Sequence, residues 1–357
     1  MAYAFADYGV AWWGLDRAAT VWLAVAAVVV LSIVNLCGVV AGKTTQNVLT
    51  TAKMLGLVLI VATGLFCAPA EVPATAPSTT GSGLGLALVF VLYAYGGWND
   101  AAFVSAEVKD GRRNIPLSLF LSIGIITLIY LLVNLSFLYV LGFEGVRQTS
   151  APATDMLARI AGTRASGAIS ILVMISALSA INGLILTGSR IFRIVGDDHR
   201  SFSVLARVDR TKSIPFGAIV VQALISVALI AAVGTDRGRE TVDQSLQTVG
   251  LSALPWQDYY GGFETLVAAS APIFWMFFLL TGIALFVLRV RDKHCERPFI
   301  MPWFPLPAIV FCVTCVFMLQ ASLVYAKGLV LIASIPVALG LPLYLLSRLT
   351  RNKAKRD

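Results

Sequence analysis

The feature that most constrains this chain is a series of long stretches without a single charged residue. Nine such stretches occur, at residues 18–42, 54–70, 72–99, 114–143, 165–189, 213–235, 265–288, 298–326 and 328–347. A helix needs about 20 apolar residues to cross the hydrocarbon core of a membrane, whereas a barrel strand needs about ten that alternate. The stretches are continuous and too long for barrel strands. They predict an all-α, polytopic membrane protein.

The composition agrees, because hydrophobic residues make up 58% of the 357 residues and charged residues only 13%. An average soluble domain is about 25% charged. With the polar residues at the ends of the stretches included, nine transmembrane helices are expected, at 20–41, 46–68, 84–107, 116–142, 166–194, 214–234, 262–290, 304–325 and 329–348.

The positive charges predict the orientation of the helices. Twenty of the 27 Lys and Arg residues fall in one set of connections. Cytoplasmic loops are enriched in Lys and Arg, so this set is expected inside, with the N-terminus outside and the C-terminus in the cytoplasm. Residues 1–19 would then be an external segment and 349–357 a cytoplasmic tail. The aromatic residues of 1–19 suit a membrane interface, and a disordered tail is the alternative.

The expected helix at 84–107 is interrupted by an unusual motif. Its centre reads YAYGGWNDAAF, with Gly96 and Gly97 followed by Trp98, Asn99 and Asp100. Glycine is costly inside a helix, and a carboxylate near the middle of a membrane is by default a functional-site hypothesis. Close helix packing through small residues is the alternative for the glycines. If the helix unwinds here, freed backbone groups can face a cavity.

An unwound helix of this kind has chemistry that suits a zwitterion. The first half-helix would direct its carbonyl groups at an ammonium group, and the second would direct its N–H groups at a carboxylate. An amino acid carries both groups. The motif therefore predicts a substrate site at the break.

Three further residues are candidates for a site. Lys53 lies about two turns inside the expected helix 46–68, where it either extends to the cytoplasmic surface or is a buried ammonium that fixes a neighbouring broken helix. Asn182 lies beside a stripe of small residues and either lines the cavity or makes an interhelical hydrogen bond. Trp275 either lines the cavity or packs in an apolar run.

The sequence offers little that an enzyme could use. His199 and His294, which are the only histidines, fall in cytoplasmic loops, and neither they nor the five cysteines form a metal-like spacing. No P-loop or zinc-protease motif occurs. No catalytic activity, cofactor or metal is expected.

The segment YAYGGWNDAAFVSAEVKDGRRNIPLSL resembles the sixth transmembrane helix of amino acid permeases of the APC superfamily, in particular the L-type (LAT) branch. Other blocks agree in order. QNVLTTAK resembles the start of the fifth helix of the family, INGLILTGSRIF the eighth, and GGFETLVAASAPIFW with VLRVRDKHCERPF the tenth and the loop after it. The resemblance covers the chain from about residue 20.

The resemblance implies a LeuT-like fold of twelve helices, built from two inverted repeats. Only helices four to twelve have counterparts, which implies a permease truncated at its N-terminus. Residues 1–357 are then one permease domain, with 20–68 as the last two helices of the first repeat, 84–290 as the second repeat, and 304–348 as two C-terminal helices.

The resemblance also assigns roles to single residues. Tyr93 stands where the family has an aromatic gate, and the backbone carbonyls of Tyr93, Ala94 and Tyr95 would bind the substrate ammonium. Asn99 matches a pocket position. Lys53 matches a lysine that occupies the place of sodium in sodium-coupled relatives, which implies sodium-independent transport. Asp100 departs from the commonest family pattern.

Some family members are joined to a heavy chain by a disulfide, through a cysteine in the segment that corresponds to 1–19. That segment has no cysteine here. No disulfide-linked partner is therefore expected, and a bacterial inner-membrane permease is the plainer interpretation. The expected partners are an amino acid and the lipid bilayer, without nucleic acid.

The leading hypothesis is a permease or antiporter for neutral amino acids that works by alternating access, with Tyr93, Ala94, Tyr95, Gly96, Gly97, Trp98 and Asn99 at the substrate. Two alternatives stay open. One is a non-transporting remnant or amino acid sensor that keeps the fold. The other is a permease for polyamines or cationic amino acids, which Asp100 suggests.

Overall fold

The structure is a computed structural model in which the described residues divide into two compact units. The first unit spans 1–80, 100–104 and 117–235, and the second spans 81–99, 105–116 and 236–357. Each unit is described by itself. The residues described are 1–66, 88, 91, 92, 94–103, 105, 108–149, 151–209, 214–248, 250, 252–254, 256, 262–294, 297, 300–326 and 328–353.

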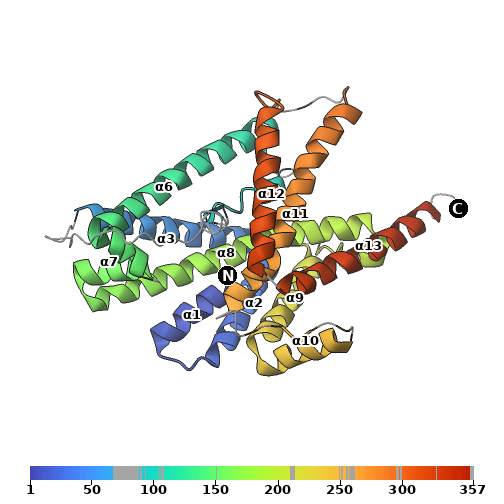
Figure 1. Ribbon diagram of the computed structural model, residues 1–357. Coiled ribbons are helices and arrows are strands. Elements are labelled where there is room, and N and C mark those ends of the chain that lie inside the picture. Colours follow the sequence, from blue (N-terminus) through green and yellow to red (C-terminus); the bar gives the residue numbers. More distant parts are fainter. Residues whose placement is uncertain are drawn as a thin grey trace. The chain divides into compact units, whose positions relative to one another are not determined.

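The described residues are helical almost throughout, which confirms the all-α prediction (Figure 1). The helices of the first unit are α1 (Ala2–Trp13), α2 (Ala19–Leu36), α3 (Val39–Phe66), α5 (Asp100–Phe103), most of α6 (Gly111–Gln148), α7 (Pro152–Ala161), α8 (Thr163–Asp198), the short η2 (Arg200–Phe202) and α9 (Phe216–Gly234). Those of the second unit are α10 (Asp236–Thr248), α11 (Gly262–Arg291), α12 (Leu306–Ala326) and α13 (Leu329–Lys353).

Seven of these helices are long and apolar enough to cross a membrane, judged on the described residues by length and composition. They are α2, α3, α6, α8, α9, α11 and α12. Each corresponds to one of the nine predicted spans. The prediction at 329–348 falls on α13, and most of 84–107 lies outside the described residues. The total of nine spans stays a prediction.

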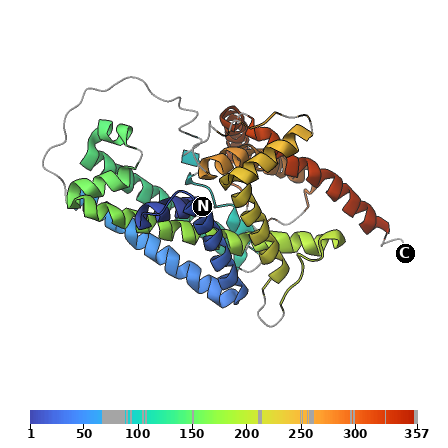
Figure 2. The same ribbon diagram turned by 90° about the horizontal axis from the view of Figure 1, so that it is seen from below.

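Helix α8 is the central helix of the first unit. Helices α1, α2, α3, α7 and α9 all contact it, and α3 runs alongside it for much of its length (Figure 2). One core cluster joins α2, α8 and α9 and consists of Ala27, Leu31, Ile181, Ile185 and Ile219. A second joins α3, α6, α7 and α8 and consists of Ile60, Val140, Met156 and Ile169.

Helix α1 is a tightly packed element that the hydrophobic pattern did not predict. The Tyr3 hydroxyl is buried and donates a hydrogen bond to the Ile230 carbonyl of α9, 2.6 Å away. Trp12 lies against Gly167 of α8, where a side chain on the glycine would overlap the indole ring. These contacts exclude a disordered tail for this segment.

The junction between α2 and α3 differs from the expected one. Helix α2 ends at Leu36, and α3 begins at Val39, seven residues before the expected start at Gln46. Gly38 takes a φ of +144°, which L side chains rarely adopt, and so it separates the two helices. The polar run from Lys43 to Thr45 continues α3, because polarity alone does not end a helix.

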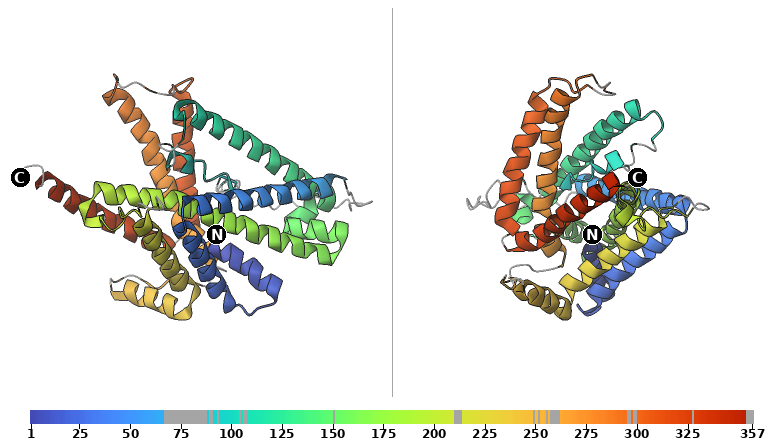
Figure 3. Two further views of the ribbon diagram at one scale, coloured as in Figure 1. Left: turned by 180° about the vertical axis from the view of Figure 1, so that it is seen from behind. Right: turned by 90° about the vertical axis from the view of Figure 1, so that its right-hand side faces the viewer.

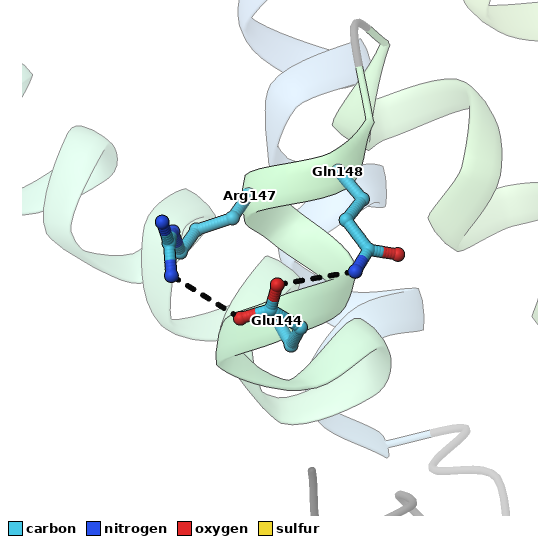
Figure 4. A network of polar contacts seen from close by, with 3 residues as sticks. All are labelled: Glu144, Arg147 and Gln148. Atoms are coloured by element: carbon cyan, nitrogen blue, oxygen red, sulfur yellow. Dashed lines mark hydrogen bonds and ion pairs between the residues drawn. The ribbon is translucent and has the colours of Figure 1, made fainter. Parts of the chain in front are cut away.

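Helix α6 changes direction near its end. Gly142 has a φ of +73° and interrupts the helical conformation. In the turn after it, the Glu144 carboxylate accepts hydrogen bonds from Arg147 at 3.3 Å and from Gln148 at 3.1 Å (Figure 4). This pair of contacts stabilises the last turn before α7.

In the second unit α11 and α12 lie side by side (Figure 3). Gly282 lets the helices approach closely, since a Cβ atom there would lie 2.6 Å from the Cys312 sulfur. Trp275, Cys315 and Met318 form the buried centre of this pair. The segment before residue 100 packs against these two helices.

Candidate functional site

The backbone departs from a helix at the glycine pair. The amide of Tyr95 still donates to the carbonyl of Val91 at 3.2 Å, as in a helix. Turns follow from Tyr95 to Asn99, and a new helix, α5, begins at Asp100. Within the described residues, the segment has the interruption that the sequence predicts.

Gly97 has a backbone conformation at this interruption that favours glycine. Its φ is +97°, and a Cβ atom built on it would meet nothing within 4 Å. The requirement for glycine is therefore conformational rather than steric, because residues with a Cβ atom rarely adopt this φ. This distinguishes Gly97 from a glycine that serves only close packing.

The predicted substrate residues divide between the described and undescribed parts of the chain. Tyr93 lies outside the described residues. Tyr95 and Asn99 are half-buried, as is Asp100 in the first turn of α5. Trp98 keeps 42% of its surface exposed. Their roles in substrate binding stay predictions.

Trp98 and Trp275, which are far apart in the sequence, meet in one aromatic cluster of the second unit. The Trp98 ring lies 5.4 Å from that of Phe278 and 6.4 Å edge-on from that of Phe311. Trp275 lies 5.9 Å from Phe278 and also contacts Phe274. Such edge-on and tilted pairs stabilise by about 0.5–1.5 kcal/mol each. The cluster attaches the break to α11 and α12.

A buried polar network occupies the junction of α2, α3 and α8 in the first unit. Asn182 has 0% of its surface exposed. Its side-chain oxygen accepts a hydrogen bond from Asn35 at 2.7 Å. Its side-chain nitrogen donates to the Gly42 carbonyl at 3.1 Å and to Gln46 at 2.9 Å. Asn182 therefore makes interhelical hydrogen bonds to both neighbouring helices.

The network continues along α3. The Gln46 amide nitrogen donates to the hydroxyl of Thr50 at 3.2 Å and to that of Ser179 at 3.4 Å. Those two hydroxyls lie 3.3 Å apart. Buried polar groups are costly unless they are paired, so this set of partners fixes the register of α3 against α8.

Lys53 lies on the same side of α3 as this network. It follows Gln46 by seven residues, which is nearly two full turns. Beyond it Gly56 packs on Leu172 of α8, so closely that a Cβ atom would lie 2.1 Å from a leucine methyl group. Lys53 is half-buried, and in the described part of the chain it makes no hydrogen bond or ion pair.

The position of Lys53 within its helix bears on its role. Helix α3 has 28 residues, and Lys53 is close to its middle. At 1.5 Å per residue, each end of the helix is about 20 Å away. A lysine side chain is far shorter, and it would not reach the end of the helix.

Of the residues in this network, only Asn182 was among the predicted site residues. The other five members were not: Asn35, Gly42, Gln46, Thr50 and Ser179. A signal for them is present. Gly42, Gln46 and Thr50 are four residues apart, so they share a helix face, as do Ser179 and Asn182. The partners lie on different helices, and sequence periodicity does not pair them.

Within the described residues, no three His, Cys, Asp or Glu side chains come together in a way that could hold a metal ion. Among the described residues of the first unit, the buried polar side chains are amides and hydroxyls, while charged groups such as Lys53 and Asp100 are half-buried. These groups bind by hydrogen bonding and charge.

The chain belongs to the amino acid permease family, whose sequence model matches residues 1–346. The LAT-branch resemblance is confirmed by the relatives. The chain is 27% identical over 308 residues to the mouse b(0,+)-type amino acid transporter 1, which covers 85% of this chain and 57% of the relative. It is 26% identical over 240 residues to the human cystine/glutamate transporter. This alignment covers 67% of this chain and 42% of the relative.

A bacterial relative is the serine/threonine exchanger SteT of Bacillus subtilis. It is 23% identical over 333 residues, which cover 90% of this chain and 68% of the exchanger. The chain thus spans about half the length of the first mammalian relatives it matches. The family and these relatives are transporters, not enzymes.

Proposed function

We propose that this protein exchanges neutral amino acids across a membrane without sodium, with the substrate at the break between Tyr93 and Asp100. The observation that carries the proposal is the positive φ of Gly97 at the end of a helix in an amino acid permease. The relative SteT, which is a serine/threonine exchanger, favours exchange.

The break supplies groups that suit both ends of a zwitterion. A half-helix before the break would direct carbonyls of partial negative charge toward it, and a half-helix after the break would direct N–H groups of partial positive charge toward it. The ammonium and carboxylate of an amino acid match these two ends. Trp98, which packs on Phe278 of α11 and Phe311 of α12, is proposed to line the substrate site.

Lys53 is proposed to take the place of a coupling cation. Its mid-helix position and half-buried side chain support this role, since a cation inside a membrane protein is retained where it has a function. Transport by a protein with a resident ammonium group needs no sodium at that place.

The proposed setting is a bacterial inner membrane, with the N-terminus outside and the C-terminus in the cytoplasm. The distribution of Lys and Arg supports this orientation. The absence of cysteine from residues 1–19 supports function without a disulfide-linked heavy chain. Residues 84–290 are proposed to form the second repeat of the permease fold.

The experiment is uptake of radiolabelled serine and leucine into liposomes that contain the purified protein. The vesicles are preloaded with unlabelled amino acid, and external sodium is compared with choline. Saturable uptake of equal rate in both salts is expected. Uptake that disappears in choline would contradict the proposed role of Lys53, and uptake that ignores preloading would contradict exchange.

A second candidate is transport of polyamines or cationic amino acids. Asp100 favours it, because this carboxylate lies half-buried directly after the break. Competition separates the two candidates. Leucine should displace labelled substrate at concentrations where putrescine has no effect, and the opposite order would favour the cationic candidate.

A further inference from the structure

The connection between α11 and α12 is rich in positive charge. The last turn of α11 holds Arg289 and Arg291, and Lys293 and Arg297 follow it. All except Arg289 are exposed. Arg297 donates to the Asp292 carbonyl at 3.0 Å, which folds the connection back on the end of α11.

Arg289 does not extend into solvent with the others. Its guanidinium carbon lies 3.9 Å from the centre of the Phe304 ring, in a cation–π contact. The Phe286 ring lies 5.6 Å from the same ring and supports it. Two aromatic residues therefore hold the guanidinium group in place at the end of α11.

One N–H group of this held side chain has no acceptor among the described residues. The Nε atom of Arg289 is buried and makes no hydrogen bond in the part of the chain that the structure describes. A buried donor on a charged group is costly when it is unpaired. The planar guanidinium group is the side chain best suited to bind phosphate oxygens, through two parallel hydrogen bonds.

Several large apolar residues close to Phe304 in the sequence are exposed. Trp303 is 84% exposed, Ile300 is 74% exposed and Leu306 is 61% exposed. Trp303 also has a φ of +55°, which is uncommon for a bulky residue and marks a strained position. Tryptophan is enriched at the level of lipid headgroups. Exposed apolar residues in the same connection as a held cation suit an amphipathic ligand better than a free ion.

We propose that the connection between α11 and α12 binds the headgroup of an anionic phospholipid. Arg289 binds the phosphate, and Phe304 holds the guanidinium group in position. Trp303 and Ile300 lie against the glycerol and upper acyl region. Lys293 and Arg297 add attraction for the negative charge of the leaflet. The proposal does not depend on which substrate is transported.

Native mass spectrometry of the purified protein tests the proposal, with phosphatidylglycerol and phosphatidylcholine of equal chain length titrated into detergent. The wild type is expected to retain phosphatidylglycerol preferentially. Arg289→Gln should weaken that retention by about tenfold, because it removes one charge-assisted contact. The matched control is Arg237→Gln, an exposed arginine of α10, which should leave retention unchanged.

Phe304→Leu keeps the charge but removes the ring that holds it, and it should also weaken retention. Size-exclusion chromatography identifies any misfolded variant, and Arg289→Lys then serves in place of the glutamine variant, with partial loss expected. Equal retention of the two lipids by the wild type would overturn the proposal. So would normal retention by the variants. Complete displacement by millimolar inorganic phosphate would indicate a site for a free anion rather than a lipid.

Discussion

Lys53 and Gly97 are the two residues whose surroundings are hardest to explain by packing alone. Lys53 is a half-buried cation near the middle of the 28-residue helix α3, where the polar first half of the helix gives way to an apolar second half. Gly97 has a φ of +97° with open space where a side chain would be. The proposed transport site makes a testable prediction for each of these two residues.

Lys53→Gln should reduce exchange by about tenfold or more, because a neutral amide cannot supply the positive charge that the proposed role of Lys53 requires. The matched control is Lys43→Gln, an exposed lysine of the same helix, which should transport normally. Rates of labelled amino acid uptake in liposomes check the prediction. If Lys53→Gln transports as well as Lys43→Gln, Lys53 is a surface lysine and the proposed role is wrong.

Gly97→Ala should weaken substrate binding by about tenfold while the protein stays folded. A Cβ atom at this φ costs roughly 1–2 kcal/mol, which shifts the break away from its binding conformation. Gly124→Ala is the control, since Gly124 lies inside α6 and likewise has nothing within 4 Å of its Cβ position. Scintillation proximity binding measures both variants. Equal affinity of the two variants would argue against the break as the site.

At the scale of helices, α3 and α8 are joined by two different kinds of contact. Amides and hydroxyls pair at one end, where Asn182 and Gln46 meet. Close packing joins the other end, where Gly56 meets Leu172. Lys53 lies between them. The two contacts fix the helices on both sides of the lysine.

Asn182→Leu should therefore lower the melting temperature of the purified protein, because Asn35 and Gln46 would each lose a buried partner. Each buried polar group left unpaired costs about 1–3 kcal/mol. The control is Asn134→Leu, since the exposed Asn134 amide bonds only the Tyr130 carbonyl of its own helix among the described contacts. A melting temperature equal to that of the control would show that the network contributes nothing to stability.

The long helices could be predicted from the sequence because charge-free stretches have few other solutions in a membrane. Helices α7 and α10 could not be predicted from the sequence, because they are short and depend on local contacts. Asp243 of α10, for example, accepts hydrogen bonds from the Leu254 amide and the Trp256 ring. Such contacts join residues that no periodicity relates.

The sequence likewise predicts some parts of the candidate site and not others. The break could be predicted because a glycine pair interrupts an apolar run, and local conformation follows from local sequence. The shared contact of Trp98 and Trp275 with Phe278 could not be predicted, because it depends on how α11 packs in the folded chain. Nor could the pairing of Asn35 with Asn182, since buried amides have many possible partners.

At the scale of the whole molecule, membership of the amino acid permease family and the all-helical fold agree with the composition. Most large apolar side chains of α6 and α12 remain exposed, as expected for helices that face lipid. A protein that kept this fold only to sense amino acids would share all of these features. Binding and flux together separate a transporter from a sensor.

The most direct measurement is therefore binding and exchange of the same labelled neutral amino acid, determined on one preparation of the protein. Scintillation proximity gives the affinity in detergent, and preloaded liposomes give the rate of exchange. The account predicts saturable binding, exchange that requires amino acid on both sides, and no change when choline replaces sodium. Saturable binding with no exchange above that of empty liposomes would contradict it and would identify the protein as a sensor.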